Sequence, residues 1–122
     1  MNKFSMIDNS VRKEIDKTFI KGVIKLIILK NIERKNNYPY GIFKKIKSNK
    51  HFIFKISKND LYNTISSMEK DGLIKSNNKI SKDNGHKTFQ ITEKGKEISK
   101  KSKEIMHSHI TALKKLMVDI NG

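Results

Sequence analysis

Four histidines in this 122-residue chain could serve as metal ligands or as catalytic bases. His107 and His109 are two positions apart, which points them in different directions on a helix, whereas metal-binding pairs need a spacing of three or four. The chain has no Cys, and no cluster of carboxylates accompanies these histidines. No nucleophile stands at motif spacing from a base, and no Gly-rich phosphate loop is present. The pattern predicts no metal site, no cofactor and no enzymatic activity.

Positive charge is the dominant chemical property of the chain. It has 27 basic and 12 acidic residues, a formal net charge of +15. Such a surplus favours a polyanionic partner, with nucleic acid first, an anionic membrane second and an acidic protein third. Because the basic residues are almost all Lys, beside abundant Asn and Ile, part of the surplus reflects an A/T-rich genome. The location of the charge is therefore more informative than its size, and residues 1–50 carry thirteen basic against four acidic residues.

Polar side chains that could contact nucleic acid recur on one face of the segment 57–72. Its apolar residues Leu61, Ile65 and Met68 have helical spacing, so the polar residues occupy the opposite face. The candidates for base or phosphate contact are Lys58, Asn59, Asn63 and Ser66, with Tyr62 at the edge. An ordinary solvated polar face is the alternative interpretation.

The apolar pattern predicts helices before this segment. A short polar helix is expected over 10–17, and a helix buried on most sides over 20–34. The helical pattern ends at Asn36-Asn37-Tyr38-Pro39, because proline lacks a backbone N–H donor and disfavours helix at the residue before it. A further helix is expected over 40–48, followed by a β-prone link over 51–56.

Local signals mark both ends of the candidate contact helix. The Ser57 hydroxyl can accept from the backbone N–H of Asp60 and so cap the helix. Gly72 can supply the left-handed residue that ends it. We therefore expect a helix that begins after Ser57 and stops at Gly72.

A hairpin and a long helix are expected after Gly72. The β-prone runs 73–80 and 87–91 flank a polar loop that contains Asn84-Gly85, a hairpin signal. Thr92 is expected to cap a final helix that continues to about Ile120.

This order of elements is that of a winged helix-turn-helix. The fold class predicted is mainly α with a small β-hairpin wing (α+β), with a DNA-binding domain over 1–92 and a C-terminal dimerisation helix over 93–122. The first helix of the motif crosses the phosphate backbone, so one or two of Lys44, Lys45 and Lys47 are expected to contact phosphate. The wing would present Lys82, His86 and Lys87 at or near its tip.

The final helix carries a broad apolar stripe. Its length, about 40 Å, exceeds what a domain of this size needs for its own core. The stripe predicted as a homodimer seam consists of Ile105, Met106, His109, Ile110, Leu113, Leu116, Met117 and Ile120. Packing within one chain is the alternative, and an N-terminal seam around Phe19 and Val23 is a second.

The chain resembles the PadR family of transcriptional regulators over residues 20–98. The landmarks are Gly22, Tyr40-Gly41, Leu61-Tyr62, the run from Glu69 to Ile74, and the run from Phe89 to Gly95. The chain departs from the family pattern at Ile42, where a second aromatic residue is usual, and at His86-Lys87, where a Pro-Arg-Lys type of wing is common. The single C-terminal helix resembles the compact branch of the family.

The resemblance implies a homodimeric, sequence-specific regulator of transcription, expected to repress by occupying a promoter. It also implies that flat aromatic ligands can bind between aromatic side chains of the final helices. Here the final helix has no Trp, Tyr or Phe, and Met106 takes that region, so we expect no tight binding of such compounds. The alternatives are a protein that coats DNA or RNA without specificity, and a winged-helix module that binds protein.

Base preference and location complete the expectations. The two arginines, Arg12 and Arg34, are far from the contact helix, whereas Asn59 and Asn63 are four apart on one face and suit the edge of adenine. We therefore expect an A/T-rich double-stranded DNA operator. No apolar run approaches the ~20 residues of a membrane span, so the sequence predicts a cytoplasmic protein.

Overall fold

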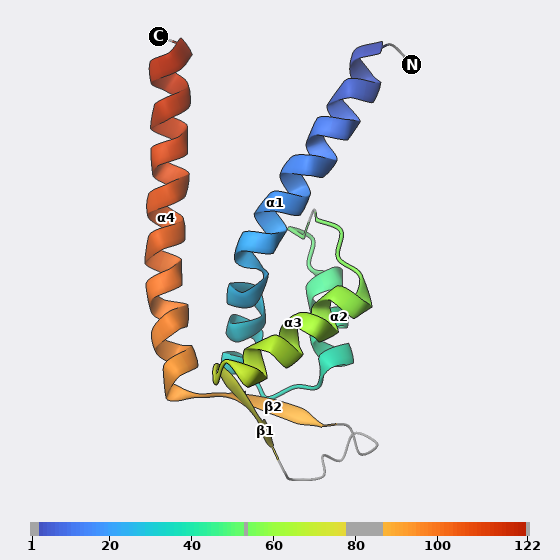
Figure 1. Ribbon diagram of the computed structural model, residues 1–122, viewed down its shortest axis with the longest axis vertical. Coiled ribbons are helices and arrows are strands. Elements are labelled where there is room, and N and C mark those ends of the chain that lie inside the picture. Colours follow the sequence, from blue (N-terminus) through green and yellow to red (C-terminus); the bar gives the residue numbers. More distant parts are fainter. Residues whose placement is uncertain (1–2, 53, 78–86, 122) are drawn as a thin grey trace.

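The computed structural model describes residues 3–52, 54–77 and 87–121, with side chains from Asn9 onward. The elements described are α1 (Lys3–Arg34), α2 (Pro39–Ser48), α3 (Lys58–Lys70), β1 (Ile74–Asn77), β2 (Thr88–Ile91) and α4 (Glu93–Asn121) (Figure 1). The expected fold class, mainly helical with a small two-stranded hairpin between α3 and the last helix, is confirmed.

The N-terminal part differs from the prediction. Two helices were expected over 10–17 and 20–34, but a single helix, α1, runs through both. Nothing between them interrupts the backbone hydrogen bonds, since Thr18 turns its hydroxyl back to the Glu14 carbonyl at 3.0 Å and stays within the helix. Gly22 is also tolerated within α1, because a side chain there would meet no atom within 4 Å.

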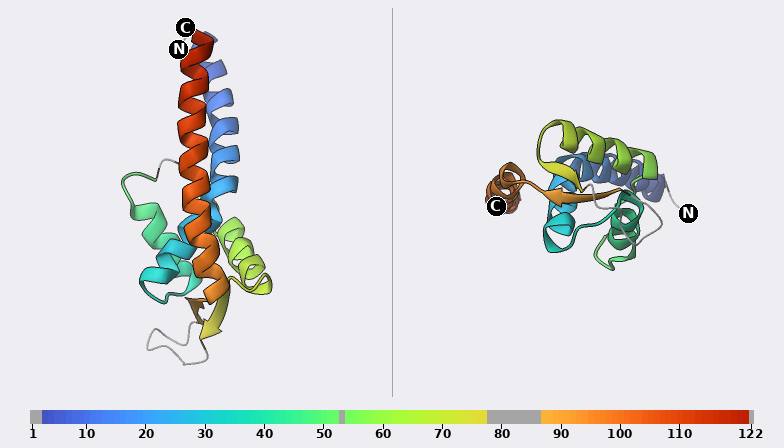
Figure 2. Two further views of the ribbon diagram at one scale, coloured as in Figure 1. Left: turned by 90° about the vertical axis from the view of Figure 1, so that its left-hand side faces the viewer. Right: turned by 90° about the horizontal axis from the view of Figure 1, so that it is seen from below.

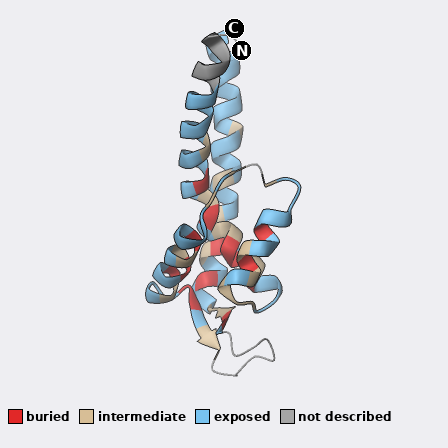
Figure 3. Ribbon diagram, turned by 90° about the vertical axis from the view of Figure 1, so that its right-hand side faces the viewer, coloured by how far each residue is buried: buried red, intermediate tan, exposed pale blue. Residues whose placement is uncertain are grey.

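The hydrophobic core lies between the C-terminal half of α1, the helices α2 and α3, and the hairpin (Figure 3). Helix α1 contributes a stripe on which Ile28, Leu29 and Ile32 are at most 1% exposed. The other elements contribute Ile42, Ile46, Leu61, Ile65, Met68, Leu73, Ile74 and Phe89. The core is aliphatic, with Phe89 as its one buried aromatic residue among those described.

The predicted boundaries of α2 and α3 are confirmed to within a residue. Pro39 occupies the first turn of α2, where its missing N–H costs no hydrogen bond. The Ser57 hydroxyl accepts from Asp60 N at 3.1 Å and begins α3. Gly72 ends α3 with φ of 77°, a conformation that glycine adopts without steric cost.

The hairpin is antiparallel, and the link between α1 and α2 pairs with its second strand. The part of the molecule formed by the core, α2, α3 and the hairpin is called the head below. Ile74 pairs with Ile91, and Asn77 pairs with Thr88. The backbone N–H of Phe89 also donates to the Asn37 carbonyl at 3.0 Å, so the link between α1 and α2 flanks β2. The predicted turn at Asn84-Gly85 lies outside the described residues.

Thr92 joins the end of α3 to the beginning of α4. Its backbone N–H donates to the Leu73 carbonyl at 3.1 Å, and its hydroxyl lies 2.6 Å and 3.0 Å from the Gly72 and Leu73 carbonyl oxygens. The same hydroxyl accepts from Gly95 N at 3.0 Å, which confirms the predicted cap of α4. One threonine therefore fixes the first turn of α4 against the turn that ends α3.

Gly95 allows this contact to be close. A Cβ at this position would lie 2.2 Å from the Leu73 carbonyl oxygen and 2.8 Å from Ile91 Cγ1. Lys94 adds a hydrogen bond from its ammonium group to the Asp71 carbonyl at 2.7 Å. The cap residue Thr92 and the first turn of α4 as far as Gly95 thus pack directly against the turn that ends α3.

Helices α1 and α4 extend away from the core as two antiparallel arms (Figures 1 and 2). They lie side by side near the head and diverge toward the two chain ends, which lie at the same side of the molecule. Helix α4 has only Gly95 and Ser99 buried among its described residues. Within the described chain, none of the helices combines the length and the apolar character that crossing a membrane would require.

Candidate nucleic-acid interface

The exposed face of α3 is polar along its whole length. With 100° per residue, Asn59, Asn63, Ser66 and Lys70 fall within an arc of about 60°. The buried stripe of Leu61, Ile65 and Met68 lies on the opposite side of the helix. All four polar residues are exposed, so burial of the apolar stripe in the core directs the predicted contact residues outward. Lys70 continues this face and was not among the residues predicted.

Tyr62 is half-buried and packs against the core. It lies on the flank of α3 that also carries Lys58, as the predicted edge position requires. Only part of its ring is therefore accessible to a ligand of the exposed face.

Tyr40 connects α2 with α3 through two lysines. Its ring centroid lies 4.9 Å from Lys58 Nζ and 5.6 Å from Lys44 Nζ. A cation over an aromatic face is attracted by the ring quadrupole, so the ring gathers two positive charges at the junction of the two helices. Sequence reasoning did not select Tyr40, because the residue that gives it this role, Lys58, is eighteen positions away.

The three lysines of α2 fall into different surroundings. Lys44 belongs to the cluster around Tyr40, and Lys47 lies over the Phe43 ring at 5.6 Å. Lys45 lies on another side of the helix, in a hollow shared with Lys30 and Arg34 of α1. The structure therefore does not bring the three predicted residues together.

Lys87 is held at the loop end of the two strands, next to Thr88. Its ammonium group lies 3.9 Å from Glu69 Oε1 of α3 and 5.9 Å from the Phe89 ring centroid. Ser76 of β1 donates to the other oxygen of Glu69. The Lys87 side chain is still 62% exposed, so it remains accessible. The predicted wing residues Lys82 and His86 lie outside the described residues.

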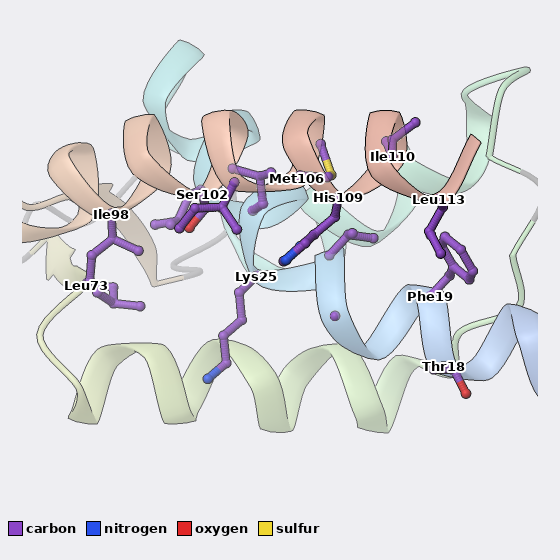
Figure 4. A pocket seen from close by; sticks show the side chains of 15 residues that line it. Thr18, Phe19, Lys25, Leu73, Ile98, Ser102, Met106, His109, Ile110 and Leu113 are labelled. Carbon is purple, nitrogen blue, oxygen red and sulfur yellow. The ribbon is translucent and has the colours of Figure 1, made fainter. Parts of the chain in front are cut away.

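A groove of about 590 Å³ separates α1 from α4 (Figure 4). Phe19 of α1 and Leu113 of α4 face one another across it, and His109 points from α4 toward α1. Five residues of the predicted seam line the groove: Ile105, Met106, His109, Ile110 and Leu113. The other three, Leu116, Met117 and Ile120, are exposed farther along α4.

The first part of the predicted seam lies beside α1. Residues 18–29 of α1 line the groove together with α4, so α1 accompanies α4 as far as Phe19 and Leu113. The apolar residues are nevertheless uncovered, with Phe19 46% and Leu113 48% exposed.

Two ion pairs join neighbouring turns of α4, Lys96 with Glu93 and Lys101 with Glu97. On α4, a hydrogen bond from Lys101 lowers the pKa of Glu97 below its ordinary value, and the same bond raises the pKa of Lys101. Within the described residues, no three His, Asp or Glu side chains come together in a way that would hold a metal ion.

Comparison with known proteins places this geometry among regulators of transcription. The model of the transcriptional regulator PadR-like family matches residues 28–101. A PadR-like transcriptional regulator from Bacillus cereus has 26% identity over 82% of this chain and 96% of that one, with a TM-score of 0.69. A transcriptional regulator from Clostridium thermocellum has 26% identity over 80% and 93% of the two chains, with a TM-score of 0.72.

A third similar structure extends the likeness in fold. It is a PadR family transcriptional regulator from Eggerthella lenta, with 19% identity over 92% of this chain and 96% of that one and a TM-score of 0.78. At that identity the likeness concerns the fold alone. No curated protein sequence matches the chain significantly.

Proposed function

Since the chain belongs to the PadR-like family of transcriptional regulators, we propose that it is a cytoplasmic, sequence-specific DNA-binding repressor that acts as a homodimer. The observation that carries this proposal is the exposed polar face of α3, with Asn59 and Asn63 on the side opposite the buried stripe. A helix-turn-helix places such a face in the major groove, where amide side chains read base edges.

The contacts to the phosphate backbone are assigned to the lysines beside this face. Lys44 and Lys58, gathered by Tyr40, lie where the first helix of the motif would cross the backbone. The proposed set also includes Lys45 and Lys47 of α2, Lys87 at the loop end of the strands, and Lys82 and His86 of the wing. Phosphate contacts of this kind add affinity without sequence preference.

Surface area supports pairing of two chains. The single chain exposes 9599 Å², whereas a compact monomer of 14.2 kDa would expose about 6,800 Å². The diverging arms contribute to this excess, because Phe19, Ile105 and Leu113 line the groove between them in exposed positions. A second copy inserting an α4 helix between the arms would cover these side chains, and apolar burial would stabilise the dimer.

A homodimer of this kind has a definite geometrical consequence. Two heads related by a two-fold axis bind two half-sites, spaced by about 10 bp or a multiple of it. Repression is then steric, because a dimer that occupies a promoter excludes other proteins from it. A ligand that changes the angle between the two heads would release the DNA.

The proposed operator is A/T-rich. Asn can make two hydrogen bonds to the N6 and N7 edge of adenine, and each good pair of this kind discriminates by about 1–3 kcal/mol. Asn59 and Asn63 offer two such contacts for each half-site, whereas arginine, the usual reader of guanine, does not occur on α3.

The test is selection of binding sites from random duplex DNA with the full chain and three variants. Asn63→Ala should relax base preference at one position of each half-site, whereas Lys44→Ala should lower affinity for all sequences and reduce the salt dependence. Ser67→Ala is the matched control, because Ser67 is exposed on α3 and points about 70° away from the centre of the Asn59–Lys70 face. It should leave both preference and affinity unchanged.

Four outcomes would count against this proposal. G/C-rich half-sites, or an Asn63→Ala protein with unchanged preference, would refute the assignment of base contacts. Uniform coating of DNA without a preferred site would favour a nucleic-acid-coating protein. Failure to bind any duplex at low salt would favour a protein-interaction module.

A further inference from the structure

A second hollow, of about 350 Å³, lies where α1, α2 and the segment after α2 meet. Three parts of the chain supply its basic side chains: Lys30 and Arg34 from α1, Lys45 from α2, and His51 from the following segment. Phe52 and Phe54 also line it. These six residues are called the basic hollow below. It is separate from the groove between α1 and α4 and shares no residue with it.

The charge in the basic hollow is one-sided. No carboxylate belongs to its described lining. Glu33, the acidic residue nearest to Arg34 in the sequence, lines a different hollow together with Lys96 and Lys100. Like charges gathered at one concavity repel each other, and the repulsion is stronger near the protein surface than in bulk water. An anion bound there would convert this repulsion into attraction.

Arg34 makes the hollow different from other lysine-rich parts of the surface. The chain has only two arginines beside its many lysines, so arginine is the residue that the composition does not favour. The guanidinium presents its donors in a planar fork that matches two oxygens of a phosphate. Lys30 precedes Arg34 by four positions on α1, which places the two side chains on the same face of the helix.

Two aromatic rings lie next to these cations in a fixed arrangement. The rings of Phe52 and Phe54 are 5.8 Å apart between centroids and inclined by 67°. The turn after α2 positions them, since Asn49 Oδ1 accepts from His51 N at 2.8 Å and the Asn49 carbonyl accepts from Phe52 N at 3.0 Å. Both phenylalanines are half-buried, with one part packed against the core and another part lining the hollow.

We propose that the basic hollow binds a small phosphate monoester that carries a planar ring, of the size of a mononucleotide. Arg34 and Lys30 bind the phosphate oxygens, and the ring packs against Phe52. The volume lies at the lower end of the range of about 300–1,000 Å³ for small-molecule sites, which excludes large ligands. The phosphate of the ligand thus matches the basic side chains of the hollow, and its planar ring matches the phenylalanine beside them.

The bound phosphate also engages Lys45. If DNA binding occurs as proposed above, Lys45 serves the DNA backbone as well, and the ligand competes for its charge. Ligand binding then weakens DNA binding, so the hollow acts as an effector site. This consequence rests on the proposed function, whereas binding of the ligand itself does not.

The experiment is calorimetric titration of the DNA-free full chain at about 0.15 M salt, where long-range attraction is screened. The probes are adenosine 5′-monophosphate, adenosine and inorganic phosphate. We expect saturable binding of the monophosphate at one site per chain and weaker binding of the two fragments. Arg34→Gln should weaken binding of the monophosphate roughly tenfold or more, because the substitution removes charged hydrogen bonds to the phosphate. Phe52→Leu should remove the advantage of the monophosphate over inorganic phosphate.

The matched control is Arg12→Gln. Arg12 is exposed on the same helix and outside the basic hollow, so the variant removes the same charge and the same side chain elsewhere. The affinity of this variant for the monophosphate should stay within about twofold of that of the unchanged protein.

Three results would overturn the proposal. Equal losses in Arg34→Gln and Arg12→Gln would mean that only the overall positive field attracts the probe. Affinity of the monophosphate weaker than about 1 mM would mean that the hollow is no site for it. A loss of DNA affinity in Arg34→Gln without any binding of the monophosphate would assign the hollow to the DNA interface. Failure of the DNA-binding proposal, by contrast, would appear in site selection and leave these titrations unchanged.

Discussion

Replacement of Gly95 by alanine tests whether the first turn of α4 must pack against the Leu73 carbonyl. The added Cβ would lie 2.2 Å from that oxygen and 2.8 Å from Ile91 Cγ1. A backbone carbonyl cannot rotate away as a flexible side chain can, so either α4 or the turn at Gly72 has to shift. The shift would lengthen the hydrogen bond from Thr92 N to Leu73 O, which is 3.1 Å in the structure.

The size of the effect follows from three contributions. Overpacking costs about 1–3 kcal/mol, and weakening one or two hydrogen bonds adds about 1 kcal/mol each. The better helix propensity of alanine offsets about 1 kcal/mol of this. The free energy of unfolding should therefore fall by about 2–3 kcal/mol, which corresponds to a Tm lower by roughly 8–12 °C for a chain of this size.

Gly22→Ala is the matched control, because Gly22 is also a helical glycine but a Cβ there would meet no atom within 4 Å. In this variant only the better helix propensity of alanine acts, so the free energy of unfolding should rise by about 0.5–1 kcal/mol. Both variants are made in a Leu113→Asp background, so that pairing of chains does not contribute. Thermal unfolding by circular dichroism measures the difference. Equal stabilities of the two variants would refute the assignment of the close contact at Gly95.

Three further predictions concern the surfaces. Tyr40→Leu should lower DNA affinity about threefold and Tyr40→Phe should not, since the ring attracts the two lysines; equal loss in both, measured by fluorescence anisotropy, would contradict this. Leu113→Asp should sediment as a monomer at concentrations where Val118→Asp, on the opposite side of α4, remains a dimer; two dimers would place the seam elsewhere. A planar aromatic dye should show no saturable micromolar binding in the α1–α4 groove, and binding that is abolished by Met106→Ala would show this expectation to be wrong.

Features that depend on neighbours in the sequence were predicted well. The cap at Ser57 and the stop at Gly72 are decided within a few residues, and both are confirmed. The apolar stripe of α3 likewise follows from periodicity alone, and its burial directs Asn59 and Asn63 outward. Such local chemistry needs no knowledge of the rest of the chain.

Features that depend on contacts between distant segments were missed. The continuity of α1 past Thr18 depends on the absence of a strong stop, which periodicity does not register. The role of Tyr40 appears only when α3 brings Lys58 to it. The basic hollow assembles Arg34 and His51, seventeen positions apart, from a helix and the segment after the next helix. No spacing rule connects such residues, because the fold determines which of them meet.

The junction at Thr92 makes α4 a long lever whose pivot lies at its first turn. The helix is fixed at one end by hydrogen bonds to Gly72 and Leu73, and 29 residues extend from that point. At 1.5 Å per residue the lever measures about 43 Å, so a tilt of about 5° at the pivot moves the far end by nearly 4 Å. Conversely, a partner that displaces the far end by a few ångströms rotates the pivot, and with it the turn that ends α3, by only a few degrees. A large displacement at the far end of α4 would therefore change the orientation of the exposed face of α3 by only a small angle.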